Sequence, residues 1–341
     1  MKPVLSAQQN AVVQSTASTP AITIVLPFEP KMVKKHELEF QLKLHQQKAE
    51  QQLLDKYASD IAVPVIRKLQ HIVKKINYNS FRKSLVIHVS SSQEKVLYLD
   101  MELESRLIMD KPFSILEVLS LKKEIRKFVV LQLGLQQSNF YLYDGRMTRL
   151  RSNSLSHTRF IKKYKDLCQV NSRNEIFLRY TDEALDEIVR QNPYPVFIIG
   201  SDDQIKKFRE QTVHSFNISG FIAAGDAEMN ERKIRVLLKA TIGDWKIIHQ
   251  QSLLVRAETS FTRKRLARGI DEVISQVKKR NGKLMLVEKK EAPLKDDIMD
   301  SILEMAVING CDIEFVDAGL LHQFGHIALI LRNPDEGHYN F

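Results

Sequence analysis

The sequence contains few cysteines and no long apolar run. Cys168 and Cys311 are the two cysteines among 341 residues, and they stand far apart in the chain. That spacing offers neither a disulfide framework nor a thiolate metal site. No apolar stretch approaches the roughly 20 residues of a membrane-spanning helix, and the first residues lack the apolar core of a signal peptide. We therefore expect a soluble, cytoplasmic protein without a membrane partner.

Several signatures of catalysis and ligand binding are missing as well. The chain has 12 glycines but no Gly-Gly pair, and no glycine-rich phosphate loop, Gly-x-Ser-x-Gly or His-Glu-x-x-His string occurs in it. The polar residues after Gly200 include two carboxylates, which would repel phosphate and suit a helix N-cap instead. His322 and His326 flank a turn rather than a metal-binding helix face. We expect neither a metal nor a small-molecule cofactor.

One part of the chain has no acidic side chain at all. Between Asp144 and Asp166 the sequence carries seven lysine and arginine residues. Uncompensated positive charges repel one another, so a segment that keeps them is suited to an anionic partner such as a phosphate backbone. We predict a flexible cationic arm at 145–172 that projects from a sheet, and the alternative is a solvated loop without a partner. The candidate RNA-binding residues of the arm are Arg146, Arg149, Arg151, His157, Arg159, Lys162, Lys163 and Lys165.

The excess of positive charge is local. Lysine and arginine number 16 against 12 acidic residues in 1–118, 22 against 15 in 119–249, and 13 against 14 in 250–341. The arm accounts for the whole excess of the middle part. A second basic cluster lies on a predicted long helix at 250–280, where a solvated helix face and a supporting contact to RNA are equally good interpretations. Its members are Arg263, Lys264, Arg265 and Arg268.

Hydrophobic periodicity predicts three successive α/β domains, with mixed sheets flanked by helices. The domains are expected at 21–118, 119–249 and 250–341, after a flexible N-terminus at 1–20. In the middle domain strands alternate with helices, which indicates a sheet that is at least partly parallel. Helices are predicted at 34–57, 60–77, 173–190, 202–213, 250–280 and 296–309. Strands are predicted at 21–26, 84–89, 95–99, 104–109, 128–133, 139–143, 194–199, 218–224, 283–287, 311–316 and 325–331.

Local strings in all three parts resemble the class-one release factors of archaea and eukaryotes and their relative Pelota. The strings are Ile22 to Pro27, Leu85 to Ser90, Phe128 to Arg149, Ser219 to Asp226 and Phe324 to Arg332. The nearest similarity is to the bacterial branch of this superfamily, to which the hibernation factor Balon is also related. The resemblance implies a release-factor/Pelota-like fold of three α/β domains in a bacterial translation factor.

The departures from the family pattern concern its chemistry. Members that release peptides carry Gly-Gly-Gln on the central-domain arm, whereas the corresponding arm here has a single glutamine, Gln169. Its neighbours Cys168 and Val170 lack the backbone freedom of glycine. The family's stop-codon motif Asn-Ile-Lys-Ser is also missing, since the string at 76–80 has no lysine. Neither decoding nor hydrolytic chemistry is therefore expected to carry over.

The resemblance implies a non-catalytic, ribosome-associated factor that occupies the tRNA entry site in hibernation, rescue or translational quality control. The expected partner is the ribosome, through ribosomal RNA or tRNA, and a translational GTPase is an open candidate for a second partner. One alternative is a peptidyl-tRNA hydrolase or release factor in which Gln169 or His157 positions the water. Another is a free-standing RNA-binding protein unrelated to ribosomes.

Overall fold

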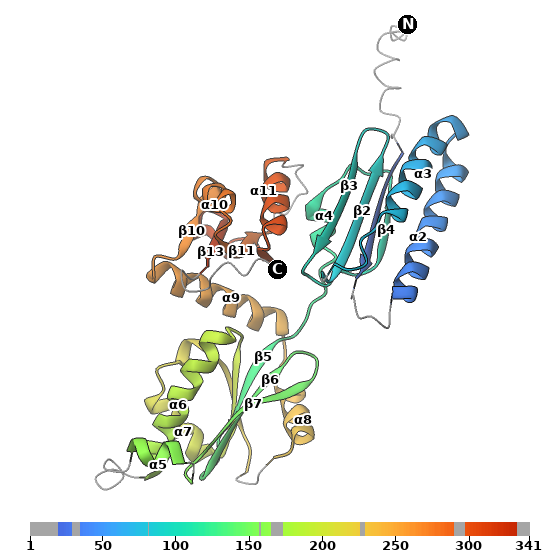
Figure 1. Cartoon of the computed structure of the whole chain (residues 1–341). Helices are drawn as coiled ribbons and strands as arrows, with labels where there is room; N and C mark the ends of the chain where they lie inside the picture. The colour runs from blue at the N-terminus through green and yellow to red at the C-terminus, as the bar shows by residue number, and fades with distance from the viewer. Residues whose placement is uncertain are drawn as a thin grey trace, which may run out of the picture. The chain divides into compact units, whose positions relative to one another are not determined.

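The computed structural model describes residues 20–28, 35–80, 82–156, 158–164, 173–225, 229–289 and 297–332. Over these residues the chain forms three β-sheets flanked by helices (Figure 1), which confirms the predicted α/β class. No described helix is long and apolar enough to span a membrane. The chain divides into two compact units, which are Met1–Lys123 with Arg268–Phe315 and Leu331–Phe341, and Glu124–Ala267 with Val316–Ile330.

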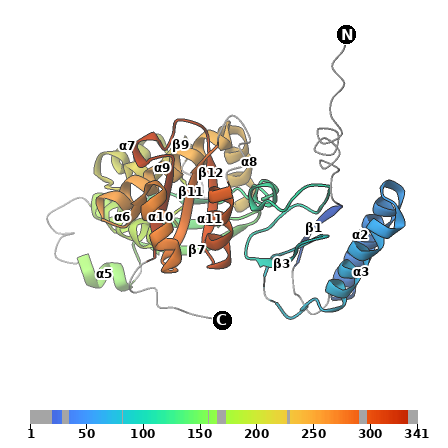
Figure 2. The same cartoon turned by 90° about the horizontal axis from the view of Figure 1, so that it is seen from above.

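The first sheet, in the order β3-β2-β1-β4, is covered on one face by α2 and α3, which lie side by side (Figure 1 and Figure 2). Side chains alternate across a strand, so Ile22, Ile24 and Leu26 of β1 face these helices and form one buried cluster with Leu42 and Leu69. All three strand pairs are antiparallel, so this sheet is antiparallel and not mixed as predicted. Its elements are β1 (Ala21–Pro27), α2 (Lys35–Lys56), α3 (Ser59–Lys74), β2 (Ser84–Ser90), β3 (Glu94–Leu99) and β4 (Arg106–Met109).

Within the same unit, α11 caps a short helix that follows the first sheet. The carboxylate of Asp300 on α11 (Asp297–Ile308) accepts hydrogen bonds from the backbone N–H groups of Ile115 and Leu116, at 3.1 and 3.0 Å. These donors belong to the first turn of α4 (Ile115–Leu119), where helical N–H groups have no partner within the helix. An ion pair between Lys95 and Glu304 of α11, at 2.6 Å, supports the same contact.

The third sheet has the order β10-β13-β11-β12. Its strands are short and apolar, and Leu284, Leu286 and Leu329 are fully buried. Its elements, with the helix between the first two strands and the short turn before the last, are β10 (Leu266–Arg268), α10 (Gly269–Lys278), β11 (Gly282–Glu288), β12 (Asp312–Val316), η4 (His322–Phe324) and β13 (Ile327–Leu331).

The central sheet, in the second unit, has the order β7-β6-β5-β8-β9. β5, β8 and β9 run parallel, as the sequence predicts, while β6 and β7 add antiparallel strands at one edge. Helices α6 and α7 cover one face, and α8 with the start of α9 covers the other. The elements are β5 (Phe128–Gln132), β6 (Gln137–Tyr143), β7 (Met147–Ser154), α5 (Thr158–Tyr164), α6 (Arg173–Gln191), β8 (Val196–Gly200), α7 (Asp202–Gln211), η3 (Ser215–Asn217), β9 (Ile218–Ala223), α8 (Glu231–Thr241) and α9 (Trp245–Thr262).

The predicted long helix at 250–280 is wrong, because α9 ends at Thr262 and α10 begins at Gly269. Lys264 adopts the left-handed conformation with φ 57°. The N–H of Arg265 donates to the carbonyl of Ser260 at 2.7 Å, and the N–H of Lys264 donates to the carbonyl of Phe261 at 2.9 Å. These two bonds form a Schellman motif, the usual device that ends a helix.

The prediction also missed strand β7 and helices α5 and α8. Both β7 and α5 lie inside the segment predicted as a flexible arm, so over 147–154 and 158–164 that prediction is wrong. β7 pairs with β6 along its length, and pairing to a neighbouring strand holds a sequence of low strand propensity in place.

Candidate nucleic-acid interface

A three-residue turn joins β6 to β7 and carries the first of the predicted RNA-binding residues. Gly145 takes φ 99°, a conformation that glycine adopts without steric cost. Arg146 follows it at the tip of the turn and is exposed. Because β7 is the edge strand of the central sheet, the turn and this edge are open to a partner.

Arg149 and Arg151 lie on opposite faces of the sheet because a β-bulge separates them. Arg149 stands opposite Tyr141 and Arg151 stands opposite Phe140, which leaves Leu150 between them without a partner. Residues that pair directly share a face, so Arg149 lies on the face covered by α8 and Arg151 on the face covered by α6. Regular alternation would have placed both on one face, and the extra residue of the bulge re-aims the second.

Arg151 is compensated by α6. Its guanidinium donates to the carboxylate of Glu187 at 2.6 Å and to Oδ1 of Asn153 at 2.9 Å, and it lies 5.9 Å from the ring centre of Tyr180. The expectation that all the positive charges of the segment lack partners is therefore wrong. The compensating carboxylate is 36 residues away in sequence, so a count over the segment could not include it.

Helix α5 is held against α6 by aromatic side chains. Phe160 and Tyr164 are buried, and the ring of Phe160 packs against Phe177 and Tyr180 with centroids 5.9 and 5.5 Å apart. Aromatic pairs in such tilted and edge-to-face geometries stabilise a contact beyond the area that they bury. This docking holds α5 against α6.

A second acidic residue of α6, Glu183, neutralises Lys163. Lys163 Nζ and the hydroxyl of Tyr164 both donate to the Glu183 carboxylate, at 2.5 and 2.6 Å. The hydrogen bond from Lys163 to Glu183 raises the pKa of Lys163. Burial alone would raise the pKa of Glu183, but the bonds from Lys163 and Tyr164 outweigh it and hold that pKa below its usual value. Lys163 is thus a partly compensated charge.

Arg146 and Arg149 differ from these two residues because neither makes an ion pair with any residue that the structure describes. Both are exposed. Of the other predicted residues, His157 and Lys165 lie outside the described residues, as does Gln169, and the side chains of Arg159 and Lys162 are not described.

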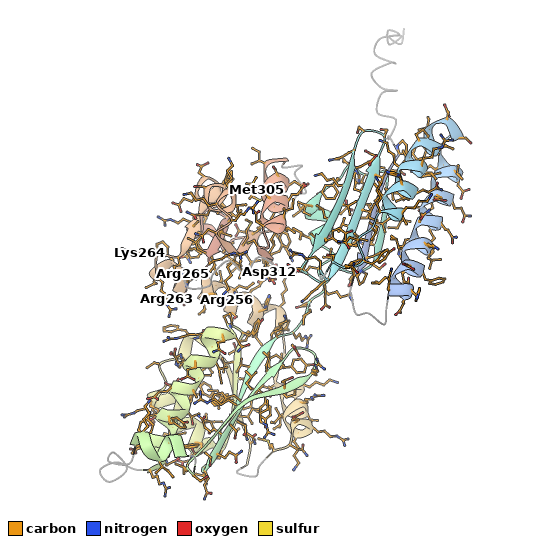
Figure 3. All side chains as sticks on the ribbon, viewed as in Figure 1. Arg256, Arg263, Lys264, Arg265, Met305 and Asp312 are labelled. Atoms are coloured by element: carbon orange, nitrogen blue, oxygen red, sulfur yellow. The ribbon has the colours of Figure 1, made fainter. Side chains whose placement is uncertain are left out.

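The second basic cluster lies at a chain turn instead of on a helix face. Arg263 is the C-cap of α9, and Figure 3 shows Arg263, Lys264 and Arg265 together where that helix ends. Arg268 closes β10, and its backbone N–H donates to Glu272 at 3.0 Å. The cluster therefore combines cationic side chains with a non-helical backbone, and its predicted role in RNA binding remains a prediction.

A pocket of about 800 Å³, which the sequence did not indicate, lies at the carboxyl end of β5 beside the start of α8. Ligands of open α/β sheets bind at this edge, where the parallel strands end and the helices begin. Three arginines contribute to the lining, one from the edge strand and two from α8. The lining residues are Gln132, Gln137, Asn139, Tyr141, Arg149, Met229, Asn230, Glu231, Arg232 and Arg235.

The floor of this pocket is a hydrogen-bonded patch of amide side chains. Asn139 Nδ2 donates to Gln132 Oε1 at 3.3 Å, and Gln137 Nε2 donates to Asn139 Oδ1 at 3.1 Å. Gln132 follows Phe128 and Val130 on the same face of β5, and those two residues pack against α8. The face thus changes from apolar to polar within one strand. The polar side chains Gln132 and Asn139 are nevertheless buried, at 6% and 8% exposed.

Residues 128–281 match the family model described as bacterial archaeo-eukaryotic release factor family 3. The matched segment contains the whole central sheet, the pocket, and the edge at β7 with Arg146 and Arg149, which we call the basic edge. This segment belongs to the archaeo-eukaryotic release factor superfamily. The resemblance seen in the sequence is confirmed at that level.

Solved structures with low similarity to this chain are also found. An archaeal translation termination factor is 13% identical over 96% of this chain and 99% of that chain, with a TM-score of 0.24. Thermoplasma acidophilum Pelota is 12% identical over 75% and 82%, with a TM-score of 0.28. Saccharomyces cerevisiae Dom34 is 12% identical over 74% and 86%, with a TM-score of 0.33. At such identities and TM-scores we draw no functional conclusion from these likenesses. A search of curated proteins finds no match.

The release-factor segment carries no recognisable catalytic centre within its described part. The chain has no Gly-Gly pair, and no group of three or more histidine, cysteine, aspartate or glutamate side chains among the described residues could hold a metal ion. Cys311, elsewhere in the chain, is buried, and burial raises the pKa of its thiol to about 12, so it is a poor nucleophile at neutral pH.

Proposed function

We propose that this chain is a non-catalytic, ribosome-associated factor that binds RNA through the basic edge of its release-factor segment. It would act in the cytoplasm at the tRNA entry site, in hibernation, rescue or translational quality control. The observation that carries the proposal is the pair Arg146 and Arg149. Both are exposed, Arg146 in the turn between β6 and β7 and Arg149 on the edge strand β7, and neither has an ionic partner among the described residues.

The attraction of this edge for RNA depends on which positive charges are not already neutralised. A phosphate backbone binds most strongly to cations that are not already neutralised, because its affinity comes from the release of condensed counterions. Arg151 and Lys163 are engaged by Glu187 and Glu183, so their net attraction for RNA is reduced. Arg146 and Arg149 keep their full charge for a partner, and Arg has the planar donor geometry that suits phosphate oxygens.

The test is co-sedimentation of the full chain with purified bacterial ribosomes over a series of salt concentrations. We expect the double variant Arg146→Gln with Arg149→Gln to bind more weakly and with a shallower dependence on salt. The slope of log affinity against log salt should fall by roughly 0.7–0.9 for each lost phosphate contact.

The matched control removes two charges from the helical side of the same segment. Arg190 and Lys207 each pair with a carboxylate of their own helix, Asp186 and Asp203 respectively, so Arg190→Gln with Lys207→Gln should leave the salt slope unchanged. Equal weakening by both double variants would mean that total charge, and not the basic edge, governs binding. No co-sedimentation of the unaltered chain would refute the proposal.

We extend the proposal to a translational GTPase as a second partner. If such a GTPase delivers the chain, retention on ribosomes should rise when an elongation-factor-type GTPase and a non-hydrolysable GTP analogue are added together. Retention that is equal with and without the GTPase would count against this partner and leave the ribosome proposal in place.

A further inference from the structure

The polar pocket beside α8 has the composition of a ligand site, and RNA binding at the sheet edge does not account for it. A sheet face that packs against a helix is normally apolar, because a buried polar group costs free energy unless hydrogen bonds compensate it. Here Gln132, Asn139 and Tyr141 are each less than 10% exposed and lie together on such a face. Buried polar groups that open into a cavity are typical of binding sites.

The amide floor has unused hydrogen-bonding capacity. Gln132 Oε1 accepts from Asn139 at 3.3 Å and from the hydroxyl of Tyr141 at 3.5 Å. The other end of that amide, Nε2, makes no hydrogen bond to a described residue, although the side chain is 6% exposed and lines the pocket. A donor that lines a pocket and has no partner inside the protein is available to a ligand acceptor or to water.

The rim supplies positive charge. Arg149, Arg232 and Arg235 line the pocket, and none of them forms an ion pair with a residue in the described part of the chain. Glu231 is the one carboxylate among the described lining residues, and it lies in the first turn of α8, where the helix dipole stabilises it. Guanidinium groups bind phosphate bidentately and with more specificity than a lysine does.

We propose that this pocket binds a nucleoside phosphate, with the phosphate on the arginine rim and the base on the amide floor. Glutamine and asparagine side chains carry both donors and acceptors, which match the edges of nucleobases. Tyr141 and Met229 add aromatic and apolar surface for the base. The volume of about 800 Å³ lies within the range of about 300–1,000 Å³ that is usual for small-ligand pockets.

Two sources can supply this ligand, an unpaired nucleotide of a bound RNA or a free nucleotide. The first source rests on the proposed function and would deepen it, since an RNA strand that crosses Arg149 could place one nucleotide in the pocket. The second is independent of ribosomes. The chemistry of the site is the same in both cases, so the experiment needs one arm for each.

The test is calorimetric titration of the full chain with AMP, GMP, CMP and UMP, with a single-stranded RNA hexamer, and with inorganic phosphate and adenosine as partial ligands. We expect at least one nucleotide or the hexamer to bind at one site per chain, and to bind more tightly than phosphate or adenosine. Saturation by mononucleotides would identify the free source, and saturation by the hexamer alone would identify the RNA source.

Variants of the rim and floor separate the pocket from general charge. Arg232→Met with Arg235→Met should weaken binding of the phosphate-bearing ligand at least tenfold, because both charged donors to the phosphate are lost. Gln137→Ala should alter the preference among bases while leaving phosphate binding unchanged. The control is Lys233→Met, because Lys233 lies between the two arginines in sequence, is exposed and does not line the pocket.

Three outcomes would overturn the proposal. The first is no saturable binding of any mononucleotide or of the hexamer, and the second is binding of inorganic phosphate as tight as that of nucleotides. The third is equal weakening by the Lys233 variant and by the arginine pair. Absence of nucleotide binding together with normal co-sedimentation would refute the proposed ligand site and leave the proposed ribosome binding in place. Nucleotide binding without co-sedimentation would refute ribosome binding and leave the ligand site in place.

Discussion

His88 is expected to make the stability of the N-terminal sheet depend on pH. Its ring is 1% exposed and pairs with Thr23 Oγ1 at 2.8 Å across β1 and β2. On the other side, β3 places the ammonium-bearing Lys95 directly opposite His88. Burial first, and then the positive charge of Lys95, lower the pKa of His88 from 6.5 to about 4, because both disfavour the imidazolium form.

The sign of the effect follows from which state binds the proton. Between pH 6.5 and about 4 the unfolded chain protonates this histidine while the folded chain does not, so acidification favours unfolding. The contribution of His88 to stability is fully present above the unfolded pKa and is lost as the pH falls towards the folded value. The interval between the two pKa values corresponds to about 3 kcal/mol in total, of which about 2 kcal/mol is lost between pH 7 and pH 4.5.

The assay is urea unfolding of the unaltered chain and of His88→Gln at a series of pH values. The transition to be followed is the unfolding of the N-terminal sheet. The glutamine variant should be less stable at neutral pH because its packing is poorer, and its disadvantage should shrink by about 2 kcal/mol as the pH falls to 4.5. His71 on α3 is exposed, so His71→Gln controls for the loss of a histidine. A difference between the unaltered chain and His88→Gln that stays constant with pH would refute the reasoning.

The other expectations concern α5, α4 and peptide release. Phe160→Ala removes a buried ring and should weaken the docking of α5 by about 3–5 kcal/mol; hydrogen exchange should then accelerate at 158–164 but not in β5, and unchanged protection of α5 would contradict this. Asp300→Ala leaves the N–H groups at the start of α4 without an acceptor and should lower the free energy of unfolding in urea by about 1–3 kcal/mol. Asp300→Asn should have an intermediate effect. Equal stability of all three proteins would show that the cap is dispensable. Single-turnover assays on loaded ribosomes should show peptide release no faster than without the protein, whereas faster release that disappears in Gln169→Ala would establish an enzyme.

Local patterns were sufficient to predict most helices and strands. The apolar spacing along α3, α6 and α11 produces one buried stripe on each helix, and such a stripe is visible without any partner. The string Asn309-Gly310 predicted the end of α11, and Gly310 indeed takes φ 71° there. Glycine signals this position because it adopts the left-handed conformation without steric cost.

The same device at the end of α9 was invisible because its left-handed residue is Lys264. A lysine has no preference for that conformation, and costs roughly 1–2 kcal/mol more there than a residue without a Cβ atom. The surrounding structure must therefore impose it. The following strand β10 pairs within the third sheet, and a sheet contact of that kind depends on residues far away in sequence.

Charge compensation and side-chain direction were likewise decided by the tertiary structure. The sequence established a segment with seven positive and no negative residues, and this much needed no structure. Which charges remain available depended on α6, whose Glu183 and Glu187 reach Lys163 and Arg151.

The pocket shows the same division. Its residues come from β5, β6, β7 and α8 and from the two residues before α8, and no sequence pattern indicates that these elements form a common site. The bulge at Leu150 sends Arg149 to the pocket and Arg151 to α6, although alternation along the strand would put them together. Local sequence determines what a segment prefers, because propensity and periodicity act over a few residues. Which faces meet, and which charges are left for a partner, is set by contacts between segments that are distant in the chain.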